Sequence, residues 1–107
     1  MTIQSYSLID ITFPESVRVN ASQSDAIYES LRDQLSVEEN LSDLDESSSC
    51  LFVVAYQETD EILSAVKAGI RSAAVSASFV EVAIGDGELE SIYNSTHVPR
   101  YAGRLDL

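Results

Sequence analysis

The sequence predicts one small domain of the α/β or α+β class, with two or three helices packed on a three- to four-stranded sheet. Segments with the two-residue apolar period of a strand alternate along the chain with segments whose apolar residues recur at helical spacing. The 107 residues are enough for one domain and too few for two, and no linker divides them. The hydrophobic fraction of 45% is that of a globular domain and excludes disorder throughout.

Three segments are predicted to be the main strands. Residues 7–13 alternate apolar and polar side chains, and residues 79–84 repeat this pattern. Residues 51–56 are continuously apolar and rich in β-branched and aromatic types, which is typical of a strand covered on both faces. We therefore expect them to form the central strand, flanked by the other two, and the intervening helices permit parallel pairing. Val17 and Val19 allow a further short strand.

Helices are predicted over residues 26–35, after Thr59 and over residues 88–93. The first two carry apolar residues at every fourth position on one face. These are Ile27, Leu31 and Leu35 in the first, with Ser22 or Ser24 as cap, and Ile62, Val66 and Ile70 in the second, with Thr59 or Asp60 as cap. The Gly85-Asp86-Gly87 sequence predicts a turn, with Asp86 capping the third helix. Residues 94–107 are polar and are expected to form an extended C-terminal tail.

The acidic segment of residues 37–49 is also expected to be helical in part. Ser36 and Glu39 have the spacing of a capping box, and Val37, Leu41 and Leu44 recur at helical intervals. These patterns predict a short acidic helix over residues 37–45. The serines that follow, at 47 to 49, are expected to form a linker.

The charge of the chain is strongly negative. Eighteen Asp and Glu residues against six Lys and Arg residues give a net charge of −12 and a sequence pI of about 4.1. Both nucleic acids and anionic membrane surfaces require cations on the protein, so we expect no direct binding to either. Only one cation is a lysine, at Lys67, and low lysine with many carboxylates is also compatible with adaptation to high salt.

A cytoplasmic protein is expected from the remaining sequence features. No apolar run approaches the roughly 20 residues of a membrane helix, and residues 1–10 lack the pattern of a secretory signal. A single cysteine, Cys50, cannot form an internal disulfide, which is compatible with a reducing compartment.

Motifs for metal binding and catalysis are incomplete, so we expect no catalytic residues, no metal and no cofactor. A calcium loop starting at Asp43 has Ser48 in place of its glycine and Val54 in place of its final glutamate. Cys50 and His97 are the only candidate thiol and imidazole, and one of each cannot form a zinc site. No strained nucleophile motif such as G-x-S-x-G occurs. A buried cysteine and a solvated histidine are the expected states.

Acidic residues form the one spatial pattern that points to a function. On the helix over residues 26–35, carboxylates spaced four apart lie opposite the apolar row, and further carboxylates follow directly in the chain. Such a surface can enter a basic groove that normally holds a nucleic-acid backbone, and a solvated helix face is the simpler alternative. The predicted partner-binding residues are Asp25, Glu29, Asp33, Glu38, Glu39, Asp43, Asp45 and Glu46.

We therefore predict a non-enzymatic acidic binding protein that blocks a basic macromolecular partner. The partner would be a basic protein, with a nucleic-acid-binding protein as one form, for which the chain would act as a DNA mimic. In size and charge the chain resembles phage- or plasmid-encoded inhibitors and toxin-immunity proteins, although it shares no motif with them. Two alternatives stay open. One is a structural or assembly subunit that forms homo-oligomers through a strand edge or the tail, and the other is a small ligand-sensing regulatory domain.

Overall fold

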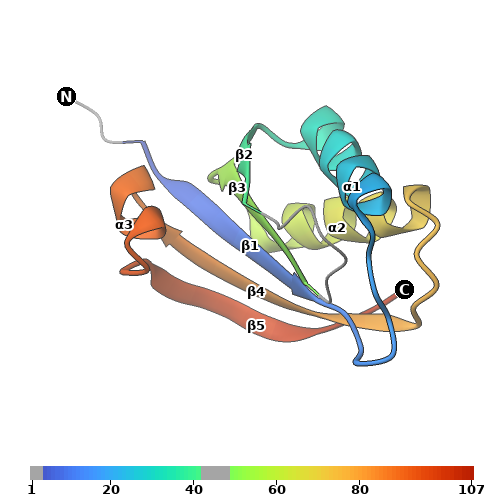
Figure 1. The fold of residues 1–107 in the computed structure, drawn as a ribbon. Helices are drawn as coiled ribbons and strands as arrows, with labels where there is room; N and C mark the ends of the chain where they lie inside the picture. The colour runs from blue at the N-terminus through green and yellow to red at the C-terminus, as the bar shows by residue number, and fades with distance from the viewer. Residues whose placement is uncertain (1–3, 42–48) are drawn as a thin grey trace.

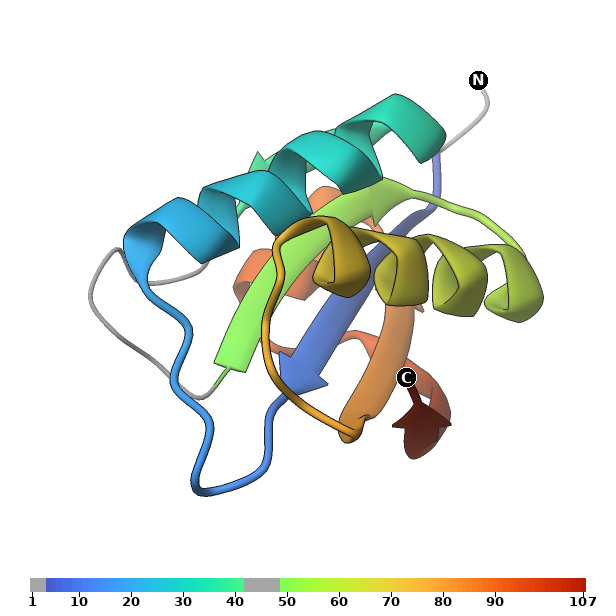
Figure 2. The ribbon, with the colours of Figure 1, turned by 90° about the vertical axis from the view of Figure 1, so that its right-hand side faces the viewer.

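The computed structural model describes residues 4–41 and 49–107 and shows an α+β fold with a five-stranded antiparallel sheet. The longer helices, α1 and α2, lie side by side on one face of this sheet (Figures 1 and 2). The described elements follow the order β1 (Tyr6–Thr12), α1 (Ala21–Gln34), β2 (Val37–Asn40), β3 (Ser49–Ala55), α2 (Thr59–Ser72), β4 (Phe79–Gly87), α3 (Leu89–Tyr93) and β5 (Val98–Asp106). The expected class is confirmed, but the sheet has more strands than the predicted three to four.

The strands are arranged in the order β2-β3-β1-β4-β5. The central strand is therefore β1, which pairs with β3 and β4, and the prediction that residues 51–56 form the central strand is wrong. Each of the units β1-α1-β2 and β3-α2-β4 skips over one strand that belongs to the other unit, as in a split β-α-β arrangement. Parallel pairing, which the intervening helices permit, does not occur, because this interleaving makes every neighbouring pair antiparallel.

The main core lies between the sheet and the two long helices. Alternate residues of β1, such as Ile9 and Ile11, point to this face and are completely buried, together with the apolar rows of α1 and α2. On the other face, α3 contacts β1 and β4, and its Ile92 is buried. Val53 of β3 is also fully buried, yet it lies outside the main core cluster, which places it on the α3 side of the sheet. Both faces of β3 are thus covered where Val53 lies.

Helix α1 begins five residues earlier than predicted. Asn20 is the N-cap: its side chain accepts a hydrogen bond from the Gln23 backbone N–H, and the Gln23 side chain accepts one from the Asn20 backbone N–H. This reciprocal pair is a capping box, and it replaces the caps expected at Ser22 and Ser24. The apolar row alone could not locate this start, because the first turn carries no large apolar side chain.

The predicted helix over residues 37–45 is wrong in its described part, because residues 37–40 form the edge strand β2. Val37 pairs with Val54 and Asn40 pairs with Phe52, with a bulge between Val37 and Glu39. Pairing with β3 gives the backbone of this segment hydrogen bonds that outweigh its helical spacing. Residues 42–48, which include most of the predicted linker, lie outside the described residues, and Ser49 belongs to β3.

The region after residue 84 also differs from the expectation. Strand β4 continues to Gly87, so residues 85–87 are not a turn. A short α3 is confirmed, but its N-cap is Glu88, and Asp86 instead accepts hydrogen bonds from Ser7 and Arg100. The predicted surface tail contains β5, a nine-residue edge strand paired with β4.

Two smaller predictions elsewhere in the chain are also wrong. Val17 and Val19 form no strand of the sheet. Thr59 and Asp60 do not cap α2, whose N-cap is Glu58.

Candidate functional site

The predicted acidic row on α1 has the expected orientation. Asp25, Glu29 and Asp33 are exposed, whereas Ile27 and Leu31 on the opposite side of the helix are completely buried. Asp25 is two turns from Asp33, which corresponds to about 12 Å along the helix axis. The structure therefore places these carboxylates along the helix and does not gather them at one point.

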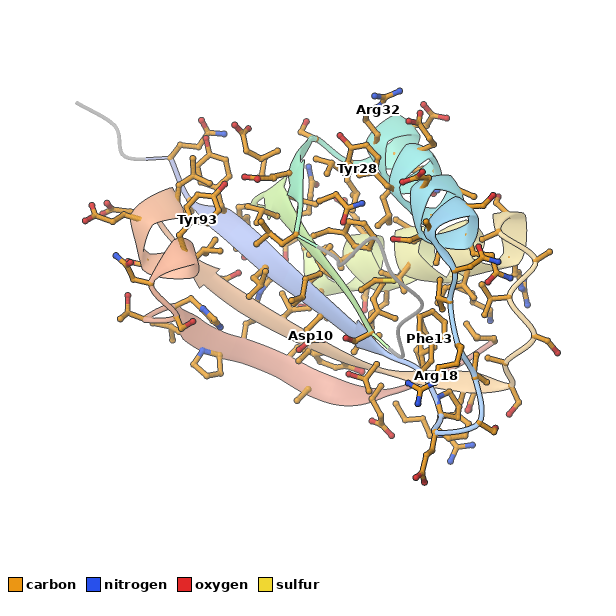
Figure 3. All side chains as sticks on the ribbon, viewed as in Figure 1. Asp10, Phe13, Arg18, Tyr28, Arg32 and Tyr93 are labelled. Atoms are coloured by element: carbon orange, nitrogen blue, oxygen red, sulfur yellow. The ribbon has the colours of Figure 1, made fainter. Side chains whose placement is uncertain are left out.

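A cation interrupts this row. The guanidinium of Arg32 forms an ion pair with Glu29, at 2.5 Å between Nη2 and Oε2, and both side chains are 54% exposed. Arg32 also lies over the ring of Tyr28, at 5.7 Å from its centroid (Figure 3). Exposed ion pairs of this kind contribute little to stability. This one nevertheless compensates the negative charge of Glu29 with the positive charge of Arg32. Asp25 and Asp33 remain as the carboxylates of the row without an ion pair among the described residues.

Strand β2 carries two more of the predicted residues. Glu38 and Glu39 are exposed on this edge strand, while Asp43, Asp45 and Glu46 lie outside the described residues. The Tyr93 hydroxyl of α3 donates a hydrogen bond to the Glu39 carboxylate. This hydrogen bond raises the pKa of the Tyr93 phenol, because ionisation would remove the donated proton and place a phenolate against a carboxylate. The charge of Glu38 adds to the effect.

The fold adds three carboxylates that the sequence analysis did not include. Gln34 and Leu35 at the end of α1 line the same groove as Asp60 and Glu61 at the start of α2, so the two helices run antiparallel. The segment between α1 and β2 lies beside the end of β3, from which the chain continues into α2. A hydrogen bond from the Ala55 backbone N–H to the Ser36 carbonyl oxygen joins them. We call the exposed carboxylates at this end the acidic corner: Asp33, Glu38, Glu58, Asp60 and Glu61. Glu39 is not included, because it pairs with Val53 and contacts Tyr93 on the α3 side of the sheet.

Cations near the acidic corner are engaged elsewhere. Arg32 is paired with Glu29. Arg100 is paired with Asp86, donates to the Gln57 carbonyl oxygen and Thr59 Oγ1, and has a side chain only 17% exposed. Arg18 lies in the connection between β1 and α1, away from the corner (Figure 3). The described part of the chain therefore has no ion pair to any carboxylate of the acidic corner.

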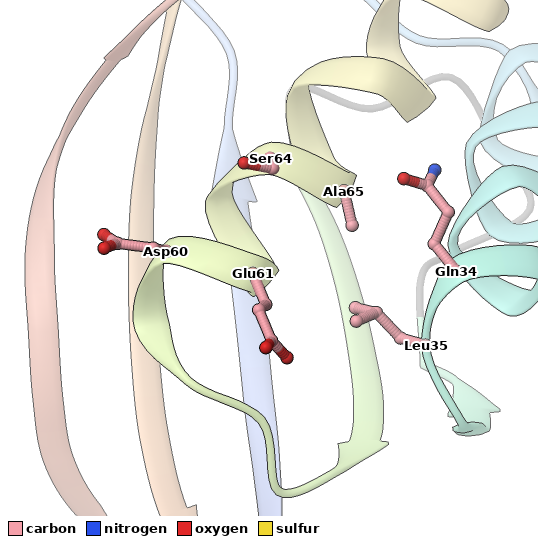
Figure 4. Close-up of a pocket in the computed structure, with 6 residues that line it drawn as sticks. All are labelled: Gln34, Leu35, Asp60, Glu61, Ser64 and Ala65. Carbon is pink, nitrogen blue, oxygen red and sulfur yellow. The ribbon is translucent and has the colours of Figure 1, made fainter.

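A groove opens within the acidic corner, between the end of α1 and the start of α2 (Figure 4). Its volume is about 390 Å³. Leu35 and Ala65 form its apolar floor and are 7% and 2% exposed. Glu61, Ser64 and Gln34 contribute polar groups around this floor, and Asp60 lies at the rim with its side chain directed away from Leu35.

A second hollow of about 260 Å³ lies over β1, β4 and β5. Asp10 and His97 line it with small and apolar residues. Burial raises the pKa of the Asp10 carboxyl, and a hydrogen bond from the Thr12 side chain opposes this shift. The His97 ring packs on Gly85, where a Cβ would lie 2.2 Å from Cδ2, and its buried Nδ1 has no hydrogen-bond partner among the described residues. His97 is thus partly buried, in contrast to the solvated side chain expected.

The only thiol and imidazole of the chain do not form a catalytic pair. Cys50 is 1% exposed in the main core, opposite Ile11 of β1. His97 packs on Gly85 of β4, and no hydrogen bond joins the two side chains in the described structure. The burial of this cysteine, predicted from its position in an apolar strand, is confirmed. Among the described residues, no group of three or more His, Cys, Asp and Glu residues is arranged to hold a metal ion.

Comparisons of the chain with protein-family models, with curated proteins and with solved structures gave no match. In the part of the chain that the structure describes, every helix is too short or too polar to cross a membrane.

Proposed function

We propose that this protein binds a basic macromolecule, most simply a basic protein, through its acidic corner and thereby blocks the partner's cationic surface. The observation that carries this proposal is that five exposed carboxylates lie on the end of α1, on β2 and at the start of α2, segments that meet at one end of the helical layer. None of them has an ion pair in the described structure. The function requires no catalytic group, since blocking results from occupancy.

The position of Asp33 supports a role in binding more than a role in stability. Asp60 and Glu61 lie in the first turn of α2, where carboxylates stabilise a helix by interacting with its dipole. Asp33 lies in the last turn of α1, where the same interaction is unfavourable. A carboxylate that opposes the helix dipole is better explained by a contact with something outside the domain.

Charge reversal at the acidic corner, compared with an equal reversal elsewhere, tests the proposal. The corner variant is Asp33→Lys with Glu38→Lys, and the control is Glu15→Lys with Glu81→Lys. All four side chains are exposed, and each pair of reversals adds four charges, taking the net charge from −12 to −8. Binding of a fluorescein-labelled deca-arginine peptide is measured by anisotropy at about 50 mM and about 500 mM NaCl.

We expect the corner variant to bind the peptide about tenfold more weakly than the control at low salt, with a flatter salt dependence. High salt should weaken binding of the unaltered protein strongly, because both partners are exposed charges. Equal losses in the two variants would show that only net charge matters and would contradict a local binding surface. A competition experiment, in which the protein displaces duplex DNA from the peptide, tests the blocking step.

A further inference from the structure

We infer that the groove between α1 and α2 is a receptor for one arginine side chain of the basic partner, an inference that rests on the proposed function. The volume of about 390 Å³ lies at the lower end of small-ligand pockets, roughly 300–1,000 Å³, and suits a single long side chain rather than a second helix. Its apolar floor and its polar rim match the two chemically distinct parts of that side chain.

The floor fits the stem of an arginine. Leu35 reaches toward Ala65 across the groove, so the bottom of the groove is hydrocarbon (Figure 4). The three methylene groups of arginine can lie on this surface while the charged head stays at the opening. A compact polar ligand, such as a metal ion, would gain nothing from the hydrocarbon that Leu35 and Ala65 present to the groove.

The rim presents hydrogen-bond acceptors to the guanidinium head. Glu61 lies on one side of Leu35 and the Gln34 amide on the other, as Figure 4 shows. The Gln34 Nε2 donates to the carbonyl oxygen and the Oγ of Ser30, both at 3.2 Å, which fixes the amide and leaves its oxygen as the acceptor. A head with donors alone matches the Glu61 carboxylate and this oxygen, whereas a carboxylate or phosphate would be repelled by Glu61 and Asp60.

Arginine fits this rim better than lysine does. A guanidinium has five N–H donors in a flat fork, so it can donate in two directions at once, toward Glu61 and toward Gln34. An ammonium is a compact and strongly hydrated charge, and it gives up more water on entering a groove with an apolar floor. The groove thus adds a position for one anchoring residue to the diffuse attraction of the acidic corner.

A titration with small analogues tests the arginine receptor directly and requires no natural partner. The probes are N-acetyl-arginine-N-methylamide, its lysine counterpart and the citrulline counterpart, which has nearly the shape of arginine without its charge. Binding is followed through the backbone amide chemical shifts of the ¹⁵N-labelled protein. We expect the arginine probe to shift the amides of Gln34, Leu35, Ser64 and Ala65 and to bind several-fold more tightly than the lysine probe, and the citrulline probe to leave these amides unchanged.

Two variants that each remove one negative charge make the test specific to the groove. Glu61→Gln should weaken the arginine probe about threefold or more. Glu15→Gln, at an exposed position between β1 and α1 and outside the acidic corner, should leave its affinity unchanged. Equal shifts with the citrulline probe, equal effects of the two variants, or shifts spread evenly over all carboxylate-bearing segments would overturn the inference. If the arginine inference is overturned in this way but the corner variant still binds deca-arginine more weakly than the control variant, the acidic corner binds its partner without this anchor. If instead only the arginine receptor is found, the groove exists and the proposed function fails.

Discussion

The guanidinium of Arg100 in β5 lies 2.9 Å from the carboxylate of Asp86 in β4, measured from Nε to Oδ2. The same guanidinium donates to Ser7 Oγ of β1 at 3.0 Å and lies over the ring of Tyr56, 4.7 Å from its centroid. Ser7 is completely buried and donates its own hydroxyl to Asp86 at 2.8 Å. One arginine therefore ties the last strand to the central strand and to the segment that precedes α2.

Replacing Arg100 should destabilise the domain. Arg100→Ala leaves the Asp86 carboxylate, which is 26% exposed, without its cation, and we expect a loss of about 2–4 kcal/mol in the free energy of unfolding, measured by urea denaturation. Arg104→Ala is the matched control, because Arg104 pairs with Asp106 at 58% and 81% exposure. Its loss should stay under about 1 kcal/mol. A similar loss in both variants would contradict a special role for the Arg100 contacts.

A charge at Val53 should abolish folding. The side chain of Val53 in β3 is completely buried on the α3 side of the sheet. Val53→Asp would therefore place an unpaired carboxylate in an apolar site. Ala102→Asp, on an exposed position of β5, provides the comparison and should stay folded. Circular dichroism with thermal melting distinguishes the two, and a cooperative melt of Val53→Asp near the temperature of the unaltered protein would refute the assignment of this site as buried.

Removing the charge of Asp33 should make the protein more stable. Asp33→Asn eliminates the unfavourable interaction with the C-terminal end of α1, worth about 0.3–1 kcal/mol. Asp25→Asn, in the N-terminal half of the same helix, should give no such gain. Thermal unfolding at low salt measures both variants. A gain accompanied by weaker peptide binding would mean that stability is sacrificed at Asp33 for binding, and the absence of any gain would remove that argument.

The carboxyl of Asp10 predicts a specific pH dependence. Burial raises its pKa in the folded state above the ordinary value of 3.8, so the folded protein binds this proton more tightly than the unfolded chain does. The ionised form is therefore destabilising, and the penalty grows as the pH rises from about 3.8 through the raised pKa. Asp10→Asn should gain stability relative to the unaltered protein near pH 7, and the difference should shrink toward pH 3 in parallel urea titrations. A difference that is independent of pH would exclude this cause.

The sequence indicated the elements whose burial pattern is periodic and missed those whose structure depends on a distant partner. The apolar rows of α1 and α2 and the alternation in β1 could be recognised because each segment has one buried face. Strand β2 could not, because its four residues carry two carboxylates and exist as a strand only through pairing with β3. Local capping and helical spacing therefore led to the wrong structure.

Strand β5 was missed for a different reason. The polar character of residues 94–107 predicted an extended tail, but these residues include an edge strand, where Pro99, which lacks a backbone N–H, is tolerated. The sequence signal that was available is the alternation of Tyr101, Gly103 and Leu105. The structure shows that Tyr101 and Leu105 are partly buried against the core. At the site, the exposed carboxylates Asp25, Asp33 and Glu38 could be selected from the sequence of α1 and of the acidic segment that follows it. The carboxylates at the start of α2 could not be selected in this way, because only the antiparallel packing of the two helices brings them near the end of α1. These are Glu58, Asp60 and Glu61.

The place of β1 in the middle of the sheet has a consequence for how the chain acquires its structure. Its partners are β3 and β4, so the first strand pairs with residues 49–55 and 81–87 and not with its neighbour in the sequence. Contacts between such distant segments carry a large loop-closure entropy and slow folding. During synthesis, the first strand leaves the ribosome long before residue 87 does, so its apolar face stays exposed until residues 81–87 have emerged. The domain therefore completes its sheet late, and strand β1 is where a chaperone would be needed first.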